Sequence, residues 1–236
     1  PAYLASKTAA FYERAGKVTC LGADERPGAL TVIGAVSPPG GDLSEPVSQA
    51  TLRVTKVFWG LDAALAYKKH FPTINWLNSY SLYTDNIAPY WKQEIAEDFG
   101  DVRAQAMSLL QEEERLLEIV RLVGMEALSA NEKITLEIAR SIREDFLFQN
   151  AFDPVDAYTP LAKQYEILKS IITVYNAAVE AARAVEEFDF EAFRALASVQ
   201  KLSDLKDIDA EKREDFEAFR TNAHSEISTL SETVSA

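Results

Sequence analysis

The chain changes character near residue 90, and this change constrains its fold more than any other feature. Most of its nine glycines and nine prolines lie before that point, among short apolar segments. Gly and Pro mark turns, so the first part predicts short strands and helices in alternation, which is typical of an α/β layer. The second part predicts a packed helical domain. We therefore expect two domains, over residues 1–90 and 91–236.

Short elements are expected throughout the first part. A turn-prone stretch, Asp24–Gly28, separates two β-rich runs. So few strands make an incomplete sheet with exposed edges, which favours a missing N-terminal portion. The absent initiator methionine fits the same expectation. The predicted helices cover residues 2–14 and 62–69, and the predicted strands cover 17–21, 30–36 and 57–61.

Helix signals run through the second part. Apolar residues recur every three or four positions between Asp101, a candidate cap, and Gly124. The sequence Ser129–Glu132 is a capping box for the next helix. The last helix is expected to fray toward Ala236. Further caps are expected at Thr159, which precedes Pro160, and at Asp189 and Asp209.

Composition excludes several kinds of function. The formal charge of −13 argues against nucleic acid as a partner and against adhesion to an anionic membrane. No apolar run approaches the length of a membrane span, so we expect no direct membrane insertion. The single cysteine, Cys20, excludes an internal disulfide framework. With only His70 and His224 besides, the sequence predicts no metal site.

One motif points to a nucleotide site. Residues 72–81 read PTINWLNSYS, and residues 34–47 read GAVSPPGGDLSEPV. Together they resemble the nucleotide-site signature of the large subunits of rotary ATPases, with Thr73 where Ser, Ala or Pro is usual. The GGDLSEP portion resembles the catalytic A subunit of the archaeal and vacuolar type. The resemblance runs from Pro1 to the C-terminus and covers less than half of such a subunit.

A phosphate-binding loop is missing from the chain. Such a loop needs closely spaced glycines followed by Lys and then Ser or Thr, and no G-x-x-x-x-G-K-[ST] occurs. The resemblance implies that the phosphate loop, the catalytic glutamate and the Mg²⁺ aspartate lie upstream in the full subunit. It therefore implies a partial P-loop NTPase nucleotide-binding domain followed by an all-α helical bundle, mostly helical overall. We expect no catalytic residue here, and we expect the isolated chain to be inactive.

The resemblance assigns an adenine-binding wall to two segments. Phe71 and Phe152 match the aromatic positions that hold the base, and Gln149, Asn150 and Ala151 accompany the second ring. Aromatic rings can stack on a flat heterocycle. The competing interpretation is that both phenylalanines are ordinary core residues. ATP or ADP with Mg²⁺ is implied for the full subunit, and no tightly bound nucleotide is expected on this chain alone.

Two further segments are assigned by the resemblance to contacts with other subunits. The loop containing Asp42, Ser44, Glu45 and Pro46 is expected near the nucleotide and the neighbouring subunit, or it is a structural turn between a strand and a helix. The turn at 124–132 resembles the rotor-facing turn of F-type β subunits, and it is equally explained as a helix end followed by a cap. The rotor-facing candidates are Glu126, Leu128, Ser129 and Glu132.

The sequence thus predicts the C-terminal portion of a catalytic A subunit, which interconverts ATP and ADP while ions are transported. The implied location is cytoplasmic and peripheral to the membrane, with B subunits and the central rotor stalk as partners. Two alternatives stay open at this point: a non-catalytic B-type nucleotide-binding subunit and an autonomous helical interaction protein. The choice between protons and sodium ions, and between synthesis and hydrolysis, is not encoded in this chain.

Overall fold

A computed structural model describes residues 2–22 and 24–232 and divides the chain into two compact units. The first unit holds Pro1–Trp59 and Ser79–Tyr83, and the second holds Gly60–Asn78 and Thr84–Ala236. This division differs from the boundary expected at residue 90, which stays a prediction about domains. The expected fraying toward Ala236 lies outside the described residues.

The first unit consists of short elements, as predicted. Strands β1 and β2 pair antiparallel, with Gly16 opposite Leu30 and Thr19 opposite Pro27. Helix α1 packs against α2. The bounds are α1 Leu4–Tyr12, β1 Gly16–Thr19, β2 Pro27–Leu30, η1 Pro39–Gly41 and α2 Pro46–Leu52.

The two remaining strands form a second ladder. Strands β3 (Val57–Leu61) and β4 (Ile74–Ser81) form a separate two-stranded sheet, and α3 (Ala63–Tyr67) lies between them in sequence. Asp62 caps α3 by accepting a hydrogen bond from the Ala64 amide at 2.7 Å. The prediction of strand 57–61 is therefore confirmed, and the helix predicted over 62–69 is present in shortened form.

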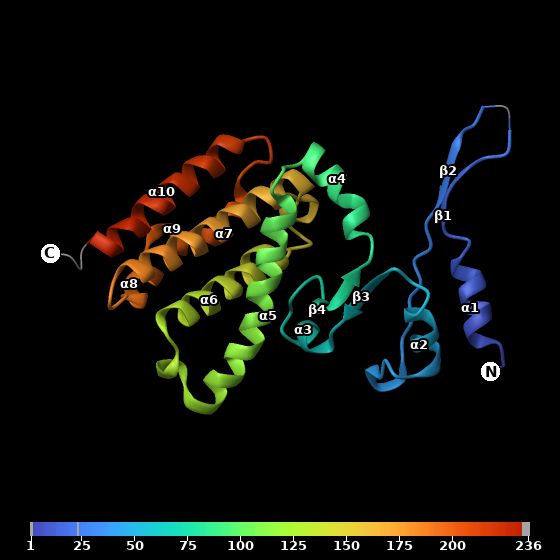
Figure 1. Cartoon of the computed structure of the whole chain (residues 1–236), viewed down its shortest axis with the longest axis horizontal. Coiled ribbons are helices and arrows are strands. Elements are labelled where there is room, and N and C mark those ends of the chain that lie inside the picture. Colours follow the sequence, from blue (N-terminus) through green and yellow to red (C-terminus); the bar gives the residue numbers. More distant parts are fainter. Residues whose placement is uncertain (1, 23, 233–236) are drawn as a thin grey trace. The chain divides into compact units, whose positions relative to one another are not determined.

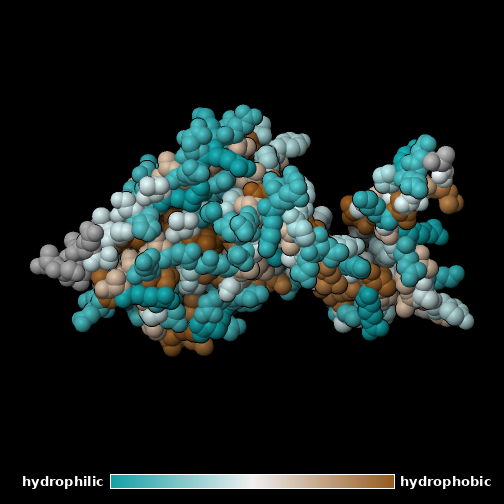
Figure 2. Space-filling model, turned by 45° about the horizontal axis from the view of Figure 1, so that its top comes forward, coloured by the Kyte–Doolittle hydropathy of each residue, from teal (hydrophilic) through white to brown (hydrophobic). Residues whose placement is uncertain are grey.

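The first unit has very little interior. Among its described residues only Ser48 and Ala50 are buried, and all four residues of β1 are exposed. Figure 2 shows apolar residues, in brown, on the surface of this unit. The small number of strands is as expected, but they form two separate two-stranded sheets and not one incomplete sheet.

The second unit is a helical bundle with one large core. Its long helices pack side by side, and α7 has its most extensive contacts with α10 (Figure 1). Phe193, Phe216, Ile171 and Ile227 are fully buried in the shared core. The bounds are α4 Thr84–Glu94, α5 Phe99–Val123, η2 Met125–Ala127, α6 Ala130–Ser141, η3 Ile142–Leu147, η4 Asp156–Tyr158, α7 Leu161–Ala184, α8 Phe190–Ala195, α9 Ala197–Gln200, η5 Leu202–Asp207 and α10 Arg213–Glu232.

Helix α6 ends in a widened turn. Segment η3 is π-helical, and the Phe148 amide donates to the Arg143 carbonyl, five residues back, at 3.0 Å. A π-turn holds one residue more than the corresponding α-helical turn. It delivers the chain to residues 148–152, the segment assigned to the adenine wall.

Several predicted element boundaries are wrong. The predicted strand 30–36 is displaced, because the observed partner of β1 is Pro27–Leu30 and overlaps the expected turn. Pro27 lies at the first residue of that strand, where a missing amide is tolerated. Pro160, not Thr159, occupies the cap position of α7, and α10 begins at Arg213, beyond Asp209.

The cap of α5 also differs from the prediction. The helix begins at Phe99, and Asp98, not Asp101, occupies the cap position. The Asp98 carboxylate instead accepts hydrogen bonds from the Tyr165 hydroxyl at 2.5 Å and lies 3.1 Å from Lys169 Nζ. Burial opposes its ionisation, but these bonds outweigh burial and lower the pKa of Asp98. A tertiary contact therefore took the place of a local cap.

Across the described ranges, no helix combines the length and the apolar character needed to span a membrane.

Candidate nucleotide-binding site

A backbone hydrogen bond brings together the two segments that were assigned to adenine. The Gln149 amide donates to the carbonyl of Phe71 at 2.6 Å, although 78 positions separate the two residues in sequence. Both segments belong to the second unit. The two phenylalanines therefore belong to adjoining segments.

Neither phenylalanine is a core residue. The Phe71 residue is 50% exposed and Phe152 is 98% exposed. Exposed rings are available for stacking on a flat ligand, and burying them against a base would remove apolar surface from water. Ordinary core packing does not account for either ring in this chain.

His70 fastens the first segment to the helical bundle. Its Nε2 lies 3.0 Å from the carbonyl oxygen of Arg143, and its Nδ1 lies 3.2 Å from that of Pro72. Its ring also contacts Trp76 and Phe148, with centroid distances of 5.7 and 5.6 Å. Sequence reasoning considered His70 only as a metal ligand and missed this role.

The second segment is a loop with its own polar scaffold. Asp156 Oδ2 accepts from the Asn150 amide at 2.6 Å, and Asn150 Oδ1 accepts from the Phe152 amide at 3.1 Å. Asp153 Oδ1 accepts from the amides of Val155 and Asp156 at 2.8 and 3.0 Å. These bonds fix the backbone that carries the Phe152 ring.

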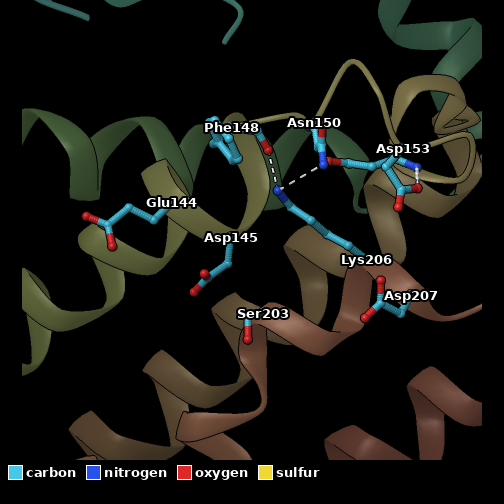
Figure 3. Close-up of a pocket in the computed structure, with 9 residues that line it drawn as sticks. Glu144, Asp145, Phe148, Asn150, Asp153, Ser203, Lys206 and Asp207 are labelled. Atoms are coloured by element: carbon cyan, nitrogen blue, oxygen red, sulfur yellow. Dashed lines mark hydrogen bonds and ion pairs between the residues drawn. The ribbon is translucent and has the colours of Figure 1, made fainter. Parts of the chain in front are cut away.

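A cavity of about 260 Å³ adjoins this loop (Figure 3). Lys206, from η5, contributes the positive charge within a mainly acidic lining. Carboxylates repel phosphate groups, so the cavity is unsuited to a triphosphate. Within the ranges that the structure describes, no three His, Cys, Asp or Glu side chains are arranged to hold a metal ion.

A larger cavity of about 720 Å³ lies beside β4 and α5, and its lining includes an ion pair whose carboxylate is buried. Arg143 Nε donates to both carboxylate oxygens of Glu113, at 2.9 and 3.0 Å. Burial raises the pKa of Glu113, although the Arg143 charge opposes this. The pair links α5 to the widened turn η3 and so supports the same turn that His70 contacts.

The loop assigned to a subunit interface is an ordered turn and helix start. Asp42 Oδ1 accepts from the Ser44 amide at 2.9 Å, and Glu45 caps α2 by accepting from the Ser48 amide at 3.0 Å. Pro46 is the first residue of α2. Hydrogen bonds from Ser44 lower the pKa of Asp42, and the Ser48 amide lowers that of Glu45. Both carboxylates thus stabilise the local backbone through hydrogen bonds. The assignment of this loop to a subunit interface stays a prediction.

The turn assigned to the rotor combines capping residues with an exposed tip. Ser129 and Glu132 form the predicted capping box, with the Ser129 amide donating to Glu132 Oε2 at 2.9 Å. Leu128 is buried in a small core with Leu116 and Leu136. Glu126 is exposed. Of the four candidates, only Glu126 has no structural task visible here, and contact with a rotor stays a prediction.

Replacing Ser129 by alanine is expected to destabilise the second unit by about 1 kcal/mol, because it removes the side-chain acceptor for the Glu132 amide. Urea denaturation followed by circular dichroism measures this. Ser108→Ala, at an exposed position within α5, is the control and should cause no loss of stability, because alanine has the higher helix propensity. Equal midpoints for the two variants would contradict the capping role.

The sequence was compared with protein families and with curated proteins. The nucleotide-binding domain of the ATP synthase alpha/beta family matches residues 1–81, and the C-terminal domain of V and A type ATP synthase matches residues 88–189. Three relatives are V-type ATP synthase alpha chains. That of Clostridium novyi is 62% identical over 184 residues, that of Thermoanaerobacter pseudethanolicus 62% over 187, and that of Clostridium botulinum 56% over 216.

These alignments cover 78%, 79% and 89% of the chain but only 31%, 31% and 37% of the respective relatives. The chain therefore spans about a third of the length of the curated relatives it matches. A solved structure titled as a unique ATP synthase subunit, NeqB from Nanoarcheaum equitans, matches with a TM-score of 0.61 and 24% identity. That match covers 74% of this chain and 40% of the other, and it supports the fold alone.

The two matched family models cover residues 1–81 and 88–189, and they define a class: the chain belongs to the ATP synthase alpha/beta family. Within that class its sequence is similar to the alpha chains of V-type ATP synthases. The predicted resemblance and fold class are confirmed. Identities of 56–62% to alpha chains also favour an alpha chain over the B-type alternative.

Proposed function

We propose that this chain acts as part of a longer V-type ATP synthase alpha chain, in which it supplies the wall that holds the adenine ring of ATP or ADP. The observation that carries the proposal is the hydrogen bond between the Gln149 amide and the Phe71 carbonyl. It joins two segments that each carry an exposed phenylalanine. The family match to a nucleotide-binding domain gives the ligand class.

The chemistry of the wall suits a purine. Phe71 and Phe152 offer apolar faces for stacking, while the side-chain amides of Gln149 and Asn150 offer donors and acceptors to the edge of the base. Ala151 places only a small side chain between Asn150 and Phe152. Bound Mg²⁺ would neutralise charge on the phosphates during phosphoryl transfer. In this proposal, the residues that hold Mg²⁺ and the phosphates belong to other parts of the longer alpha chain. The present chain alone is therefore inactive.

The contacts with other subunits are part of the same proposal. The ordered turn at Asp42–Pro46 would face a neighbouring B subunit, and the turn around Glu126 would face the central rotor stalk. Exposure of Glu126, and of Leu122 at 84%, supports a contact at that turn. Within such an assembly, nucleotide turnover would be coupled to ion transport, and the chain would lie at the cytoplasmic face of the membrane.

Photolabelling of the assembled ATP synthase with 2-azido-ATP tests the adenine wall directly. After digestion, mass spectrometry should find the label on peptides containing Phe71 or residues 149–152, and excess ATP should suppress it. The azido group reacts from the base itself, so it reports the adenine site and not the phosphate site. Specific labelling confined to peptides outside both segments would refute the proposal.

A further inference from the structure

We propose that Lys206 and Asp156 are positioning residues that clamp the loop 148–152 and thereby set the place of the Phe152 ring. This inference rests on the proposed adenine wall and extends it to η5, which begins at Leu202, 50 positions after Phe152. Neither residue is assigned to nucleotide binding by the sequence motifs.

Lys206 holds the entrance of the loop. Its ammonium group donates to the Phe148 carbonyl and lies 5.2 Å from the centroid of the Phe148 ring. In Figure 3 this group points toward the loop, whereas the carboxylate of Glu144 points away from it. Only 15% of the Lys206 side chain is exposed. A charge held in this way has few alternative positions.

Asp156 holds the middle of the loop. Its Oδ2 accepts from the Asn150 amide at 2.6 Å and lies 3.7 Å from Lys206 Nζ. Its carbonyl accepts from the Gln149 side chain at 3.4 Å. Only 12% of the Asp156 side chain is exposed, so solvent screens the ion pair weakly. The clamp therefore grips the loop on both sides of Gln149, the residue joined to Phe71.

The segment that carries Lys206 is itself anchored. Lys163, on α7, is 2% exposed and donates through Nζ to the Lys206 carbonyl at 2.5 Å. Leu202 and Leu205 of η5 are buried in the main core. The clamp thus connects the loop to the rigid part of the helical bundle.

Charge balance gives Lys206 a second effect on the loop. Among the described residues that line the adjoining cavity, Lys206 is the only cation. Five carboxylates surround it, those of Glu144, Asp145, Asp153, Asp156 and Asp207. Burial raises the pKa of Asp145. Burial also lowers the pKa of Lys206, and the nearby carboxylates oppose that second shift. Without the ammonium group, repulsion between the carboxylates would push the loop outward.

Lys206→Met tests the clamp, because it keeps the length and the apolar stem but removes the charge. In the chain itself, hydrogen exchange of the amides in 149–152 should accelerate about tenfold, since the buried carboxylate loses its partner. In the complete alpha chain, ATP and ADP should each bind about tenfold more weakly. Lys206→Arg should restore both properties, and Lys201→Met, at an exposed position beside η5, should change neither.

Circular dichroism separates these effects from unfolding, and Asp156→Asn provides a second variant if Lys206→Met does not fold. Exchange that stays at the normal rate in both variants overturns the clamp, whatever happens to nucleotide binding. Accelerated exchange with normal affinity overturns the positioning role if Phe152→Ala does weaken binding in the same preparation. If Phe152→Ala is also without effect, the adenine wall itself has failed, and the positioning role fails with it.

Discussion

Arg143→Met is expected to lower the free energy of unfolding of the second unit by about 3–5 kcal/mol, because it leaves the buried Glu113 carboxylate without its partner. Glu113 is only 5% exposed, and its two oxygens both accept from Arg143 Nε. The methionine fills similar apolar volume, so the loss reports the charge and not a cavity.

Urea denaturation at neutral pH measures this loss. Arg121→Met, at an exposed position on α5, is the matched control and should stay within about 0.5 kcal/mol of the parent. Adding Glu113→Gln to Arg143→Met should recover most of the stability, because no buried charge remains. Equal losses in Arg143→Met and Arg121→Met would show that the buried pair is not responsible.

The same variant has a predicted pH dependence. Burial holds the folded-state pKa of Glu113 above its unfolded value, and without Arg143 nothing nearby counters this as strongly. A raised pKa favours the folded state below the unfolded value of 4.5, and this contribution disappears as the pH rises through the folded value. The deficit of Arg143→Met should therefore shrink as the pH is lowered toward 4.5.

Replacing both Phe71 and Phe152 by alanine in the complete alpha chain is expected to weaken ATP and ADP binding about a hundredfold. Each ring contributes roughly 0.5–1.5 kcal/mol of stacking beyond area burial, and about 1.4 kcal/mol corresponds to a tenfold change. The two nucleotides share the base, so both affinities should fall together. Since both rings are at least half exposed, the chain itself should lose little stability.

Isothermal titration with each nucleotide measures the effect. Tyr158→Ala removes an aromatic ring that is 85% exposed but lies outside the two segments, and it should leave affinity unchanged. Unaltered binding by the double variant would rule out the adenine wall. A loss confined to ATP would instead assign the rings to a contact that depends on the γ-phosphate.

Periodicity and caps predicted much of the helical unit because their signals are local. The capping box at Ser129 and Glu132 and the Asp189 cap of α8 are both present. Boundaries failed where a tertiary contact overrode a local signal, as at Asp98, whose carboxylate bonds to Tyr165 on another helix. Strand β2 was misplaced because exposed antiparallel pairs have weakly specified register.

The candidate site was predictable only in part, and for a different reason. Phe71 and Phe152 were assigned by resemblance to a family, since no spacing rule brings residues so far apart in sequence together. The roles of His70, Arg143 and Lys206 were missed because these side chains bond to segments that are distant in sequence. A histidine that bonds to two carbonyl groups, or a lysine that bonds to the backbone of a distant loop, has no characteristic pattern in the sequence around it.

The π-turn at Ile142–Leu147 makes the length of this region as important as its composition. Each residue turns a helix by about 100°, so removing the extra one would rotate everything after it by that angle relative to α6. Gln149 would then no longer face Phe71, even if every side chain were retained. A single insertion or deletion between Ser129 and Gln149 would therefore shift loop 148–152 relative to Phe71.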